Sequence, residues 1–219
     1  IEEEEEVNRN GLGFHVPGRF DKILDIEKCF HQPDPSNAIR LAVRDYAREK
    51  EIEFFNIRKK TGVLRNLIIR NSVRNDWMVI VQFAKEDDSN EGLLNHIAEN
   101  FPEVTSLQYV INEKANETFH DLEVITYKGL PYITEEMEGI QFRVGPKSFY
   151  QTNAHQAYEL YKIARDYAGL TGEEVVYDLY TGTGTIANFV AKNAKQVVGV
   201  EYVEAAIDFP DEEIDFLSD

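Results

Sequence analysis

A glycine-rich turn between two apolar runs constrains the fold of this chain more than any other feature. The first run, residues 175–179, leads into Gly182 and Gly184, and a second run follows at residues 197–200. Short apolar runs that alternate with a helix are typical of a β-α-β unit with parallel strands. We therefore predict that a helix over residues 186–192 connects two parallel strands.

The same unit has the parts of a nucleoside-binding site. Glycine lets the backbone approach a ligand where a Cβ atom would interfere, and the N-terminus of the following helix offers free N–H groups. Glu201 closes the second apolar run, 19 positions after Gly182. A carboxylate about 20 residues after such a turn can accept hydrogen bonds from both hydroxyls of a ribose.

The order of the expected elements divides the chain into an acidic segment and two domains. Residues 1–10 are expected to be solvated, as is the acidic C-terminal end. A hairpin, a helix, three strands, a second helix and further strands predict an α+β domain over residues 11–148. Residues 149–219 then begin a doubly wound α/β domain. Such a sheet needs about five strands, and only two are visible, so this domain is expected to be incomplete.

Local patterns give finer expectations. The three strands of the first domain are expected at residues 52–57, 63–70 and 77–83, and Ser36 is expected to cap the first helix. Asn153 is expected to cap a helix that Gly169 ends. Its inward face is expected to carry Ala157, Leu160, Tyr161, Ala164 and Tyr167 or Ala168.

Charge and composition limit the classes of function that this chain can have. The 219 residues include 40 acids and 23 bases, a formal net charge of -17. An acidic chain can bind nucleic acid only through a local patch or another domain. No apolar run approaches the ~20 residues that cross a bilayer, and no secretory pattern opens the chain. One cysteine excludes an internal disulfide. We expect a soluble, cytoplasmic protein with no membrane partner.

Two cofactor classes suit the glycine turn. Gly182-Thr-Gly-Thr-Ile-Ala187 formally fits the G-x-G-x-x-A pattern of dinucleotide sites, which predicts an NAD-linked oxidoreductase. However, Asp178 lies inside the end of the first strand, where it would face the charged amino-acid part of S-adenosylmethionine. A pyrophosphate would be better served by an uncharged strand end. We favour S-adenosylmethionine, while a purely structural glycine turn is the third interpretation.

Longer motifs resemble a known family. Asp178-Leu-Tyr-Thr-Gly-Thr-Gly-Thr-Ile186 and Val198-Gly-Val-Glu201 resemble the cofactor loop and ribose-binding acid of RNA uracil-5-methyltransferases, which make 5-methyluridine in ribosomal or transfer RNA. Phe142-Arg-Val-Gly-Pro-Lys-Ser-Phe-Tyr-Gln-Thr-Asn153 resembles the segment that opens their catalytic domain. The similarity covers about residues 11–207 and is closest to the ribosomal-RNA branch. It implies a class I, Rossmann-like domain and S-adenosylmethionine-dependent methylation of uridine carbon 5 in ribosomal RNA.

The resemblance also assigns cofactor-binding residues. Gln151 matches a glutamine that contacts the cofactor, Tyr180 an aromatic at the edge of the site, and Thr185 the polar residue that opens the helix. Glu201 matches the ribose-binding acid, and Gly182 lies in the loop. An amide can pair with an amino-acid group, and a carboxylate can accept from two hydroxyls.

The catalytic residues that the resemblance implies do not occur in these 219 residues. A cysteine nucleophile would attack carbon 6 of uracil, and a carboxylate base would remove the proton from carbon 5. Both belong to segments beyond residue 207, as does an Asp-Pro-Pro motif. We therefore assign no catalytic residue and expect this chain alone to be inactive. A non-catalytic RNA-binding module of the same fold is the non-enzymatic alternative.

Cys29 matches the fourth iron–sulfur ligand of cluster-bearing relatives. A 4Fe-4S cluster normally needs four thiolates, so the other three would have to come from a segment not in this sequence. A lone cysteine is more often a small core residue. The cluster is thus an expectation for the intact protein only.

A basic stretch stands out against the acidic whole. No acid occurs between residues 56 and 75. Its cations would contact RNA phosphates, or else balance neighbouring acids. They are Arg58, Lys59, Lys60, Arg65, Arg70 and Arg74.

Overall fold

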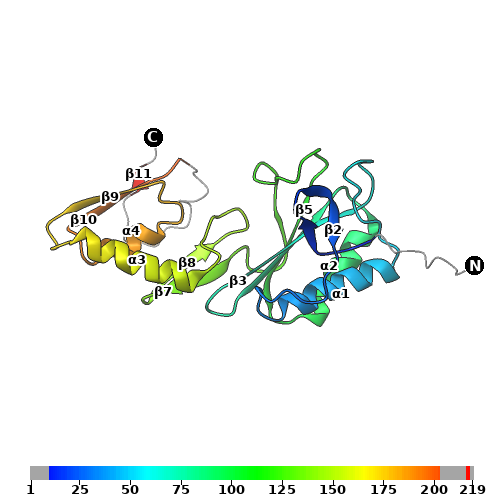
Figure 1. The fold of residues 1–219 in the computed structure, drawn as a ribbon, viewed down its shortest axis with the longest axis horizontal. Helices are drawn as coiled ribbons and strands as arrows, with labels where there is room; N and C mark the ends of the chain where they lie inside the picture. Colours follow the sequence, from blue (N-terminus) through cyan, green and yellow to red (C-terminus); the bar gives the residue numbers. More distant parts are fainter. Residues whose placement is uncertain (1–9, 203–215, 218–219) are drawn as a thin grey trace, which may run out of the picture. The chain divides into compact units, whose positions relative to one another are not determined.

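The structure is a computed structural model that describes residues 10–202 and 216–217. Its contacts divide the chain into two compact units. Within the described residues, the first unit comprises 10–70 and 77–131, and the second comprises 71–76, 132–202 and 216–217. Figure 1 labels their helices and most of their strands. The acidic ends lie almost entirely outside the described residues, so the expectations for them stay untested.

The first unit is a mixed sheet with two helices and a separate hairpin. The sheet has the strand order β3-β4-β5-β6. β4 and β5 are parallel and connected by α2, whereas β5 and β6 are antiparallel. The expected mixture of strands and helices is found, except for one strand. The bounds are β1 Phe14–Val16, β2 Arg19–Leu24, α1 Ser36–Glu49, β3 Leu64–Asn71, β4 Trp77–Phe83, α2 Asp88–Asn100, β5 Val104–Ile111 and β6 Ile125–Gly129.

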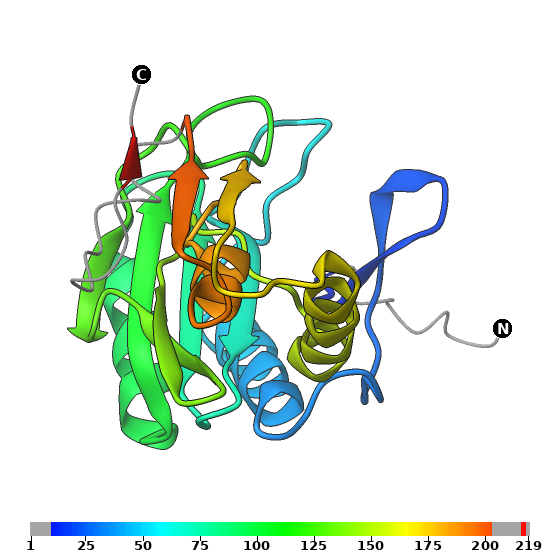
Figure 2. The same ribbon diagram turned by 90° about the vertical axis from the view of Figure 1, so that its left-hand side faces the viewer.

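The core of the first unit explains why its elements form where they do. The two helices lie side by side (Figures 1 and 2), and each turns an apolar stripe of helical period inward. Alternate residues of β4 meet these stripes, as the period of two in a strand requires. The buried residues are Ile39, Val43 and Ala47 of α1, Leu93, Leu94 and Ile97 of α2, and Trp77, Val79, Val81 and Phe83 of β4.

The prediction of a strand at residues 52–57 is wrong. This segment makes only isolated bridges, between Phe54 and Leu64 and between Asn56 and Thr61. The Glu53 carbonyl accepts from the N–H groups of both Val63 and Leu64, so the segment turns back on the start of β3. A tight connection of this kind leaves too little length for a strand pair.

The prediction that Ser36 caps α1 is also wrong. Pro35 occupies the N-cap position, and no side chain caps the helix there. The Ser36 hydroxyl instead donates to the Pro33 carbonyl oxygen at 2.5 Å. The hydroxyl thus stabilises the turn before the helix.

The second unit holds the glycine-rich turn. β9 and β10 are parallel neighbours connected by α4, which confirms the predicted β-α-β unit. β11 adds a third parallel strand beside β10. The bounds are β7 Ile133–Met137, β8 Ile140–Val144, α3 Ala154–Ala168, β9 Val175–Leu179, α4 Thr185–Ala191, β10 Gln196–Val200 and β11 Phe216–Leu217.

Residues 71–76 belong to the second unit because they bind the β7–β8 hairpin. The Thr134 N–H donates to Oδ2 of Asp76 at 2.8 Å, and the Val73 N–H donates to Oε2 of Glu135 at 3.1 Å. Ser148, near the expected domain boundary, lies inside this unit. The boundary itself concerns the intact protein and stays a prediction.

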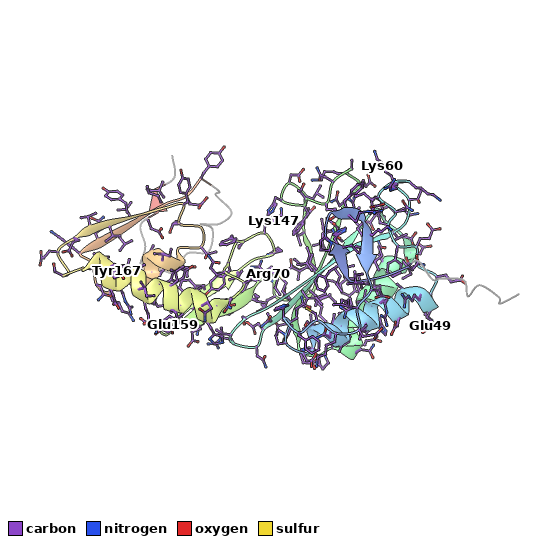
Figure 3. All side chains as sticks on the ribbon, in the orientation of Figure 1. Glu49, Lys60, Arg70, Lys147, Glu159 and Tyr167 are labelled. Atoms are coloured by element: carbon purple, nitrogen blue, oxygen red, sulfur yellow. The ribbon has the colours of Figure 1, made fainter. Side chains whose placement is uncertain are left out.

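α3 begins and ends as expected, but its inward face is only partly right. The Asn153 side chain accepts from the Gln156 N–H, and Gly169 ends the helix with a positive φ. Ala157 and Tyr161 are buried, whereas Leu160 and Tyr167 are 58% and 89% exposed (Figure 3 labels Tyr167).

One aromatic residue of α4 determines this face. The Phe189 ring contacts Tyr158, Tyr161 and Arg165, which follow one another at helical spacing. α3 therefore packs along this stripe. Among the described helices, none is long and apolar enough to span a membrane.

Candidate cofactor site

Asp178, near the carboxyl end of β9, fixes the glycine loop. Its Oδ2 atom accepts from the Thr181 hydroxyl at 2.8 Å and from the Ala187 N–H at 3.0 Å. Ala187 is the third residue of α4. One carboxylate oxygen thus holds both the loop and the first turn of the helix, where the helix dipole favours negative charge.

The two loop glycines adopt backbone conformations that other residues rarely adopt. Gly182 and Gly184 have φ angles of 57° and 71°. A Cβ atom added at Gly182 would have no heavy atom within 4 Å. Glycine is therefore needed here for its backbone, and the space beside it is open to a ligand. This space is compatible with the close approach of a nucleoside cofactor to the loop.

Glu201 lies directly against this loop. Its Oε2 atom accepts from the Gly182 N–H at 2.8 Å, and its Oε1 atom accepts from the Tyr202 N–H at 3.0 Å. A carboxylate can accept about four hydrogen bonds, so it can hold the loop and a ribose diol at once. The structure therefore brings together Gly182 and Glu201, which the sequence analysis linked by their spacing.

Gln151 reaches the same region from the segment before α3. Its side chain hydrogen-bonds to Tyr161, which is buried on α3. Burial raises the pKa of the Tyr161 hydroxyl, and the nearby Asp178 charge raises it further. Gln151 therefore lies close to Tyr161, the Asp178 charge affects the Tyr161 hydroxyl, and hydrogen bonds connect Asp178 through the loop to Glu201.

The other two predicted residues flank the loop. Tyr180 is 89% exposed and has a φ of 62°, while its N–H donates to the Val200 carbonyl at 2.8 Å. Thr185 is buried as the first residue of α4, and its hydroxyl lies 3.0 Å from that of Thr183. The Tyr180 side chain is thus exposed beside the loop, and the Thr185 hydroxyl contacts the Thr183 hydroxyl of the loop.

Sequence reasoning missed the two buried tyrosines of this region. The sequence predicts Tyr161 only as part of a helix face, and it assigns Tyr150 no role of its own within the motif over residues 142–153. The Tyr150 hydroxyl is buried and has no hydrogen-bond partner among the described residues. Burial raises its pKa, with Glu135 and Tyr161 adding to the shift. A tyrosine in an apolar pattern is usually a core residue, so no pattern could have identified either.

Cys29 lies in the first unit, with its backbone bound to α1. The Cys29 N–H donates to Oδ1 of Asn37 at 2.8 Å, and the Asn37 amide donates back to the Cys29 carbonyl. Within residues 10–202 and 216–217, no group of three or more His, Cys, Asp or Glu could hold a metal ion. One thiol does not fit a four-thiolate cluster, so the cluster role stays a prediction for the intact protein.

The six cations of the basic stretch differ in their surroundings. Arg74 belongs to the second unit and pairs with Glu136, whereas the other five belong to the first. Arg58 pairs with Asp21 at 2.6 Å. Lys59 and Lys60 are exposed (Figure 3 labels Lys60).

The assignment of Arg65 to phosphate contact is corrected. Its guanidinium donates to the backbone carbonyls of Asn112, Lys114 and Asn116 at 2.6, 2.8 and 3.0 Å. Its Cζ atom lies 4.2 Å from the centre of the Phe55 ring. Arg65 therefore stabilises a loop of its own unit.

Comparison with known proteins gives close relatives by sequence. The chain is 59% identical over 203 residues to an uncharacterized RNA methyltransferase of Bacteroides thetaiotaomicron, covering 91% of this chain and 45% of that protein. A protein of the same description from Porphyromonas gingivalis is 54% identical over 203 residues, with 91% and 44% covered. The chain thus spans somewhat less than half the length of these relatives. No protein-family model matches it.

Comparison with solved structures identifies the fold. The Pyrococcus abyssi tRNA (uracil-54, C5)-methyltransferase, solved in complex with S-adenosyl-L-homocysteine, matches with a TM-score of 0.78 and 24% identity. The match covers 96% of this chain and 53% of that enzyme. The chain is therefore homologous to part of proteins named as RNA methyltransferases, and it has the fold of the corresponding part of the Pyrococcus enzyme.

Proposed function

We propose that the intact protein uses S-adenosylmethionine to methylate carbon 5 of uridine in ribosomal RNA, and that this chain supplies part of its cofactor pocket. The observation that carries the proposal is the direct contact between the loop glycine and the acid, Gly182 to Glu201, at the carboxyl end of two parallel strands. Ligands of open α/β sheets bind at that end.

The charge at the start of α4 favours S-adenosylmethionine over NAD. A pyrophosphate binds to free N–H groups at a helix N-terminus. Here the Ala187 N–H is already bonded to the Asp178 carboxylate. A negative charge at that position repels a pyrophosphate, but it attracts the ammonium group of an amino acid. NAD-linked oxidation is therefore the weaker alternative.

Each predicted residue has a role toward the cofactor. Glu201 would accept from the ribose hydroxyls, and the open side of Gly182 would admit the nucleoside. Gln151 would bind the amino-acid part, Tyr180 would cover the exposed edge, and the Thr185 hydroxyl would bind from the helix start. When bound, S-adenosylmethionine supplies the methyl group.

The substrate part of the proposal rests on the relatives. Proteins that are 54% and 59% identical are named RNA methyltransferases, and the sequence motifs favour uridine carbon 5 of ribosomal RNA in the cytoplasm. The cysteine nucleophile and carboxylate base of that reaction are expected outside these residues. The chain alone should thus bind cofactor without turning over, and a non-catalytic RNA-binding module remains the rival.

Isothermal titration calorimetry tests the cofactor. We expect this chain to bind S-adenosylhomocysteine and to give no heat with NAD under the same conditions. A preference for NAD would exclude the methyltransferase and favour the oxidoreductase.

Labelled S-adenosylmethionine tests the reaction. We expect no methyl transfer to ribosomal RNA by this chain, and formation of 5-methyluridine by the full-length protein. Transfer by the chain alone would contradict our account of the nucleophile. If the full-length protein labels a transfer RNA transcript but not ribosomal RNA, the proposed substrate is wrong, whereas the proposed reaction is supported. If the full-length protein labels neither RNA but binds RNA, the result supports the alternative of a non-catalytic RNA-binding module.

A further inference from the structure

We propose that the first unit binds one base of a single-stranded RNA in a groove between the β1–β2 hairpin, residues 54–58 and the start of β3. This inference depends on the proposed function only for the identity of its partner, RNA. The groove is a cavity of about 390 Å³. Its lining includes His15, Phe20, Phe55, Asn56, Arg58 and Arg65.

Two pairs of an aromatic ring and a guanidinium group line the groove. The Arg58 Cζ atom lies 5.7 Å from the centre of the Phe20 ring, and the Arg65 Cζ atom lies 4.2 Å from the centre of the Phe55 ring. Phe20 is 64% exposed. An exposed ring on a strand beside a planar cation is a platform on which a base can stack.

The charge of the groove suits a base better than a phosphate. Arg58 is paired with Asp21, and the Glu117 charge faces Arg65. Both carboxylates line the cavity. Two cations and two anions leave the interior close to neutral, so a phosphate gains little there, while a flat neutral ring gains stacking. Lys59 and Lys60 are exposed next to Arg58 in the chain and can contact the adjoining phosphates.

Further hydrogen-bond donors, from Arg40 and Arg65, belong to residues that line an adjoining cavity. A second cavity of about 230 Å³ shares His15, Arg65 and three further lining residues with the first. Arg40, 5% exposed, lines it, and its Nε–H has no partner within the described part of the chain; the same is true of Arg65 Nε–H. Buried donors of this kind need acceptors.

Binding of a fluorescein-labelled, 12-nucleotide single-stranded RNA of mixed sequence, measured by anisotropy, tests the groove. Phe20→Ala should weaken binding about tenfold or more, because stacking on one aromatic ring is lost. Its dependence on salt concentration should equal that of the wild type, because no phosphate contact is lost. A Lys59→Ala, Lys60→Ala double variant should instead reduce the salt dependence by about 1.4 units of slope, about 0.7 for each lysine.

Phe30→Ala is the matched control. Phe30 is 85% exposed in the same unit, and the Lys28 ammonium lies 5.2 Å from its ring centre, yet it does not line the groove. This variant should bind within twofold of the wild type. Equal losses for the two phenylalanine variants, or no measurable binding by the wild type at 50 mM salt, would overturn the proposal.

Photocrosslinking gives a second readout that does not depend on affinity. A 5-iodouridine placed in the same RNA should crosslink to the peptides that contain Phe20 or Phe55, and crosslinks confined to other peptides would contradict the groove. Calorimetry with S-adenosylhomocysteine separates this proposal from the proposed function. If the cofactor binds and Phe20→Ala leaves RNA binding unchanged, only the groove fails. If the cofactor does not bind and Phe20→Ala weakens RNA binding, only the methyltransferase assignment fails.

Discussion

The backbone N–H of Gly182 donates a hydrogen bond of 2.8 Å to the Glu201 carboxylate. The two residues are 19 positions apart. They meet because β9 and β10 are adjacent and parallel, so that the loop after one strand and the residue after the other share one edge of the sheet. The loop thereby orients the carboxylate beside the open space at Gly182.

Glu201→Gln should weaken binding of S-adenosylhomocysteine by roughly 10- to 100-fold, because hydrogen bonds to a charged acceptor contribute about 1.5–3 kcal/mol. Calorimetry measures the affinity. Glu173→Gln is the control, since it removes an equal charge two positions before the opposite end of β9 and should bind like the wild type. Equal affinities for both variants would show that Glu201 does not contact the ribose.

Gly182→Ala should lose both stability and cofactor binding. A left-handed φ costs alanine about 1 kcal/mol, and the added methyl group enters the open space beside the loop. Gly139→Ala makes the same backbone change in the β7–β8 turn, where φ is 82° and a Cβ would also meet nothing within 4 Å. Urea unfolding should show similar losses for both variants, while calorimetry should show weaker binding only for Gly182→Ala. Weaker binding by both would mean that the loss reflects general destabilisation.

The parts of the site that are local in sequence could be predicted. The bounds expected for the first strand, residues 175–179, are those of β9. A strand–helix–strand unit of this length places two parallel strands side by side. The loop after the first strand and the acid after the second then lie at the same edge of the sheet, so their proximity could be predicted from the sequence. Helix α3 likewise begins at its cap, Asn153, and ends at Gly169.

The parts that depend on distant partners could not be predicted. Arg65 reads as a surface cation in a basic stretch, but its hydrogen-bond acceptors lie 47 to 51 positions away. The sequence indicates a core residue at Tyr161, although its hydroxyl interacts with the Gln151 side chain and with the charge of Asp178. Local periodicity specifies which side of an element is apolar, and only the tertiary fold specifies which polar groups meet there.

Arg65→Met should lower the free energy of unfolding by about 2–4 kcal/mol. The change leaves the carbonyls of Asn112, Lys114 and Asn116 without their charged donor. It also removes the cation–π contact with Phe55. Urea denaturation measures the loss, and hydrogen exchange should become faster around residues 112–116.

Arg58→Met is the control for that experiment. The Arg58 side chain is 66% exposed in its ion pair with Asp21, and exposed ion pairs contribute at most about 1 kcal/mol. A loss for Arg65→Met no larger than that for Arg58→Met would contradict the structural role of Arg65.

The Glu174 carboxylate should make the stability of the β9–β10 sheet depend on pH. Its carboxylate accepts from the Thr171 hydroxyl at 2.7 Å and from the N–H groups of Thr171, Gly172 and Glu173. The Thr171 hydroxyl and the backbone N–H groups lower the pKa of Glu174 from 4.5 to about 2. Because the Glu174 carbonyl also accepts from the Lys195 N–H, this loop connects the start of β9 to the segment before β10.

The sign of the pH effect follows from the lowered pKa. The charged form of Glu174 stabilises the fold fully above about pH 4.5, and this contribution is lost as the pH falls through about 2. Glu174→Gln should therefore melt below the wild type at pH 7, and the difference between the two melting temperatures should shrink between about pH 5 and pH 2. Glu173→Gln removes the same charge without removing the acceptor and should melt near the wild type throughout. A difference for Glu174→Gln that stays constant down to pH 2 would mean that its carboxylate does not hold the loop in charged form.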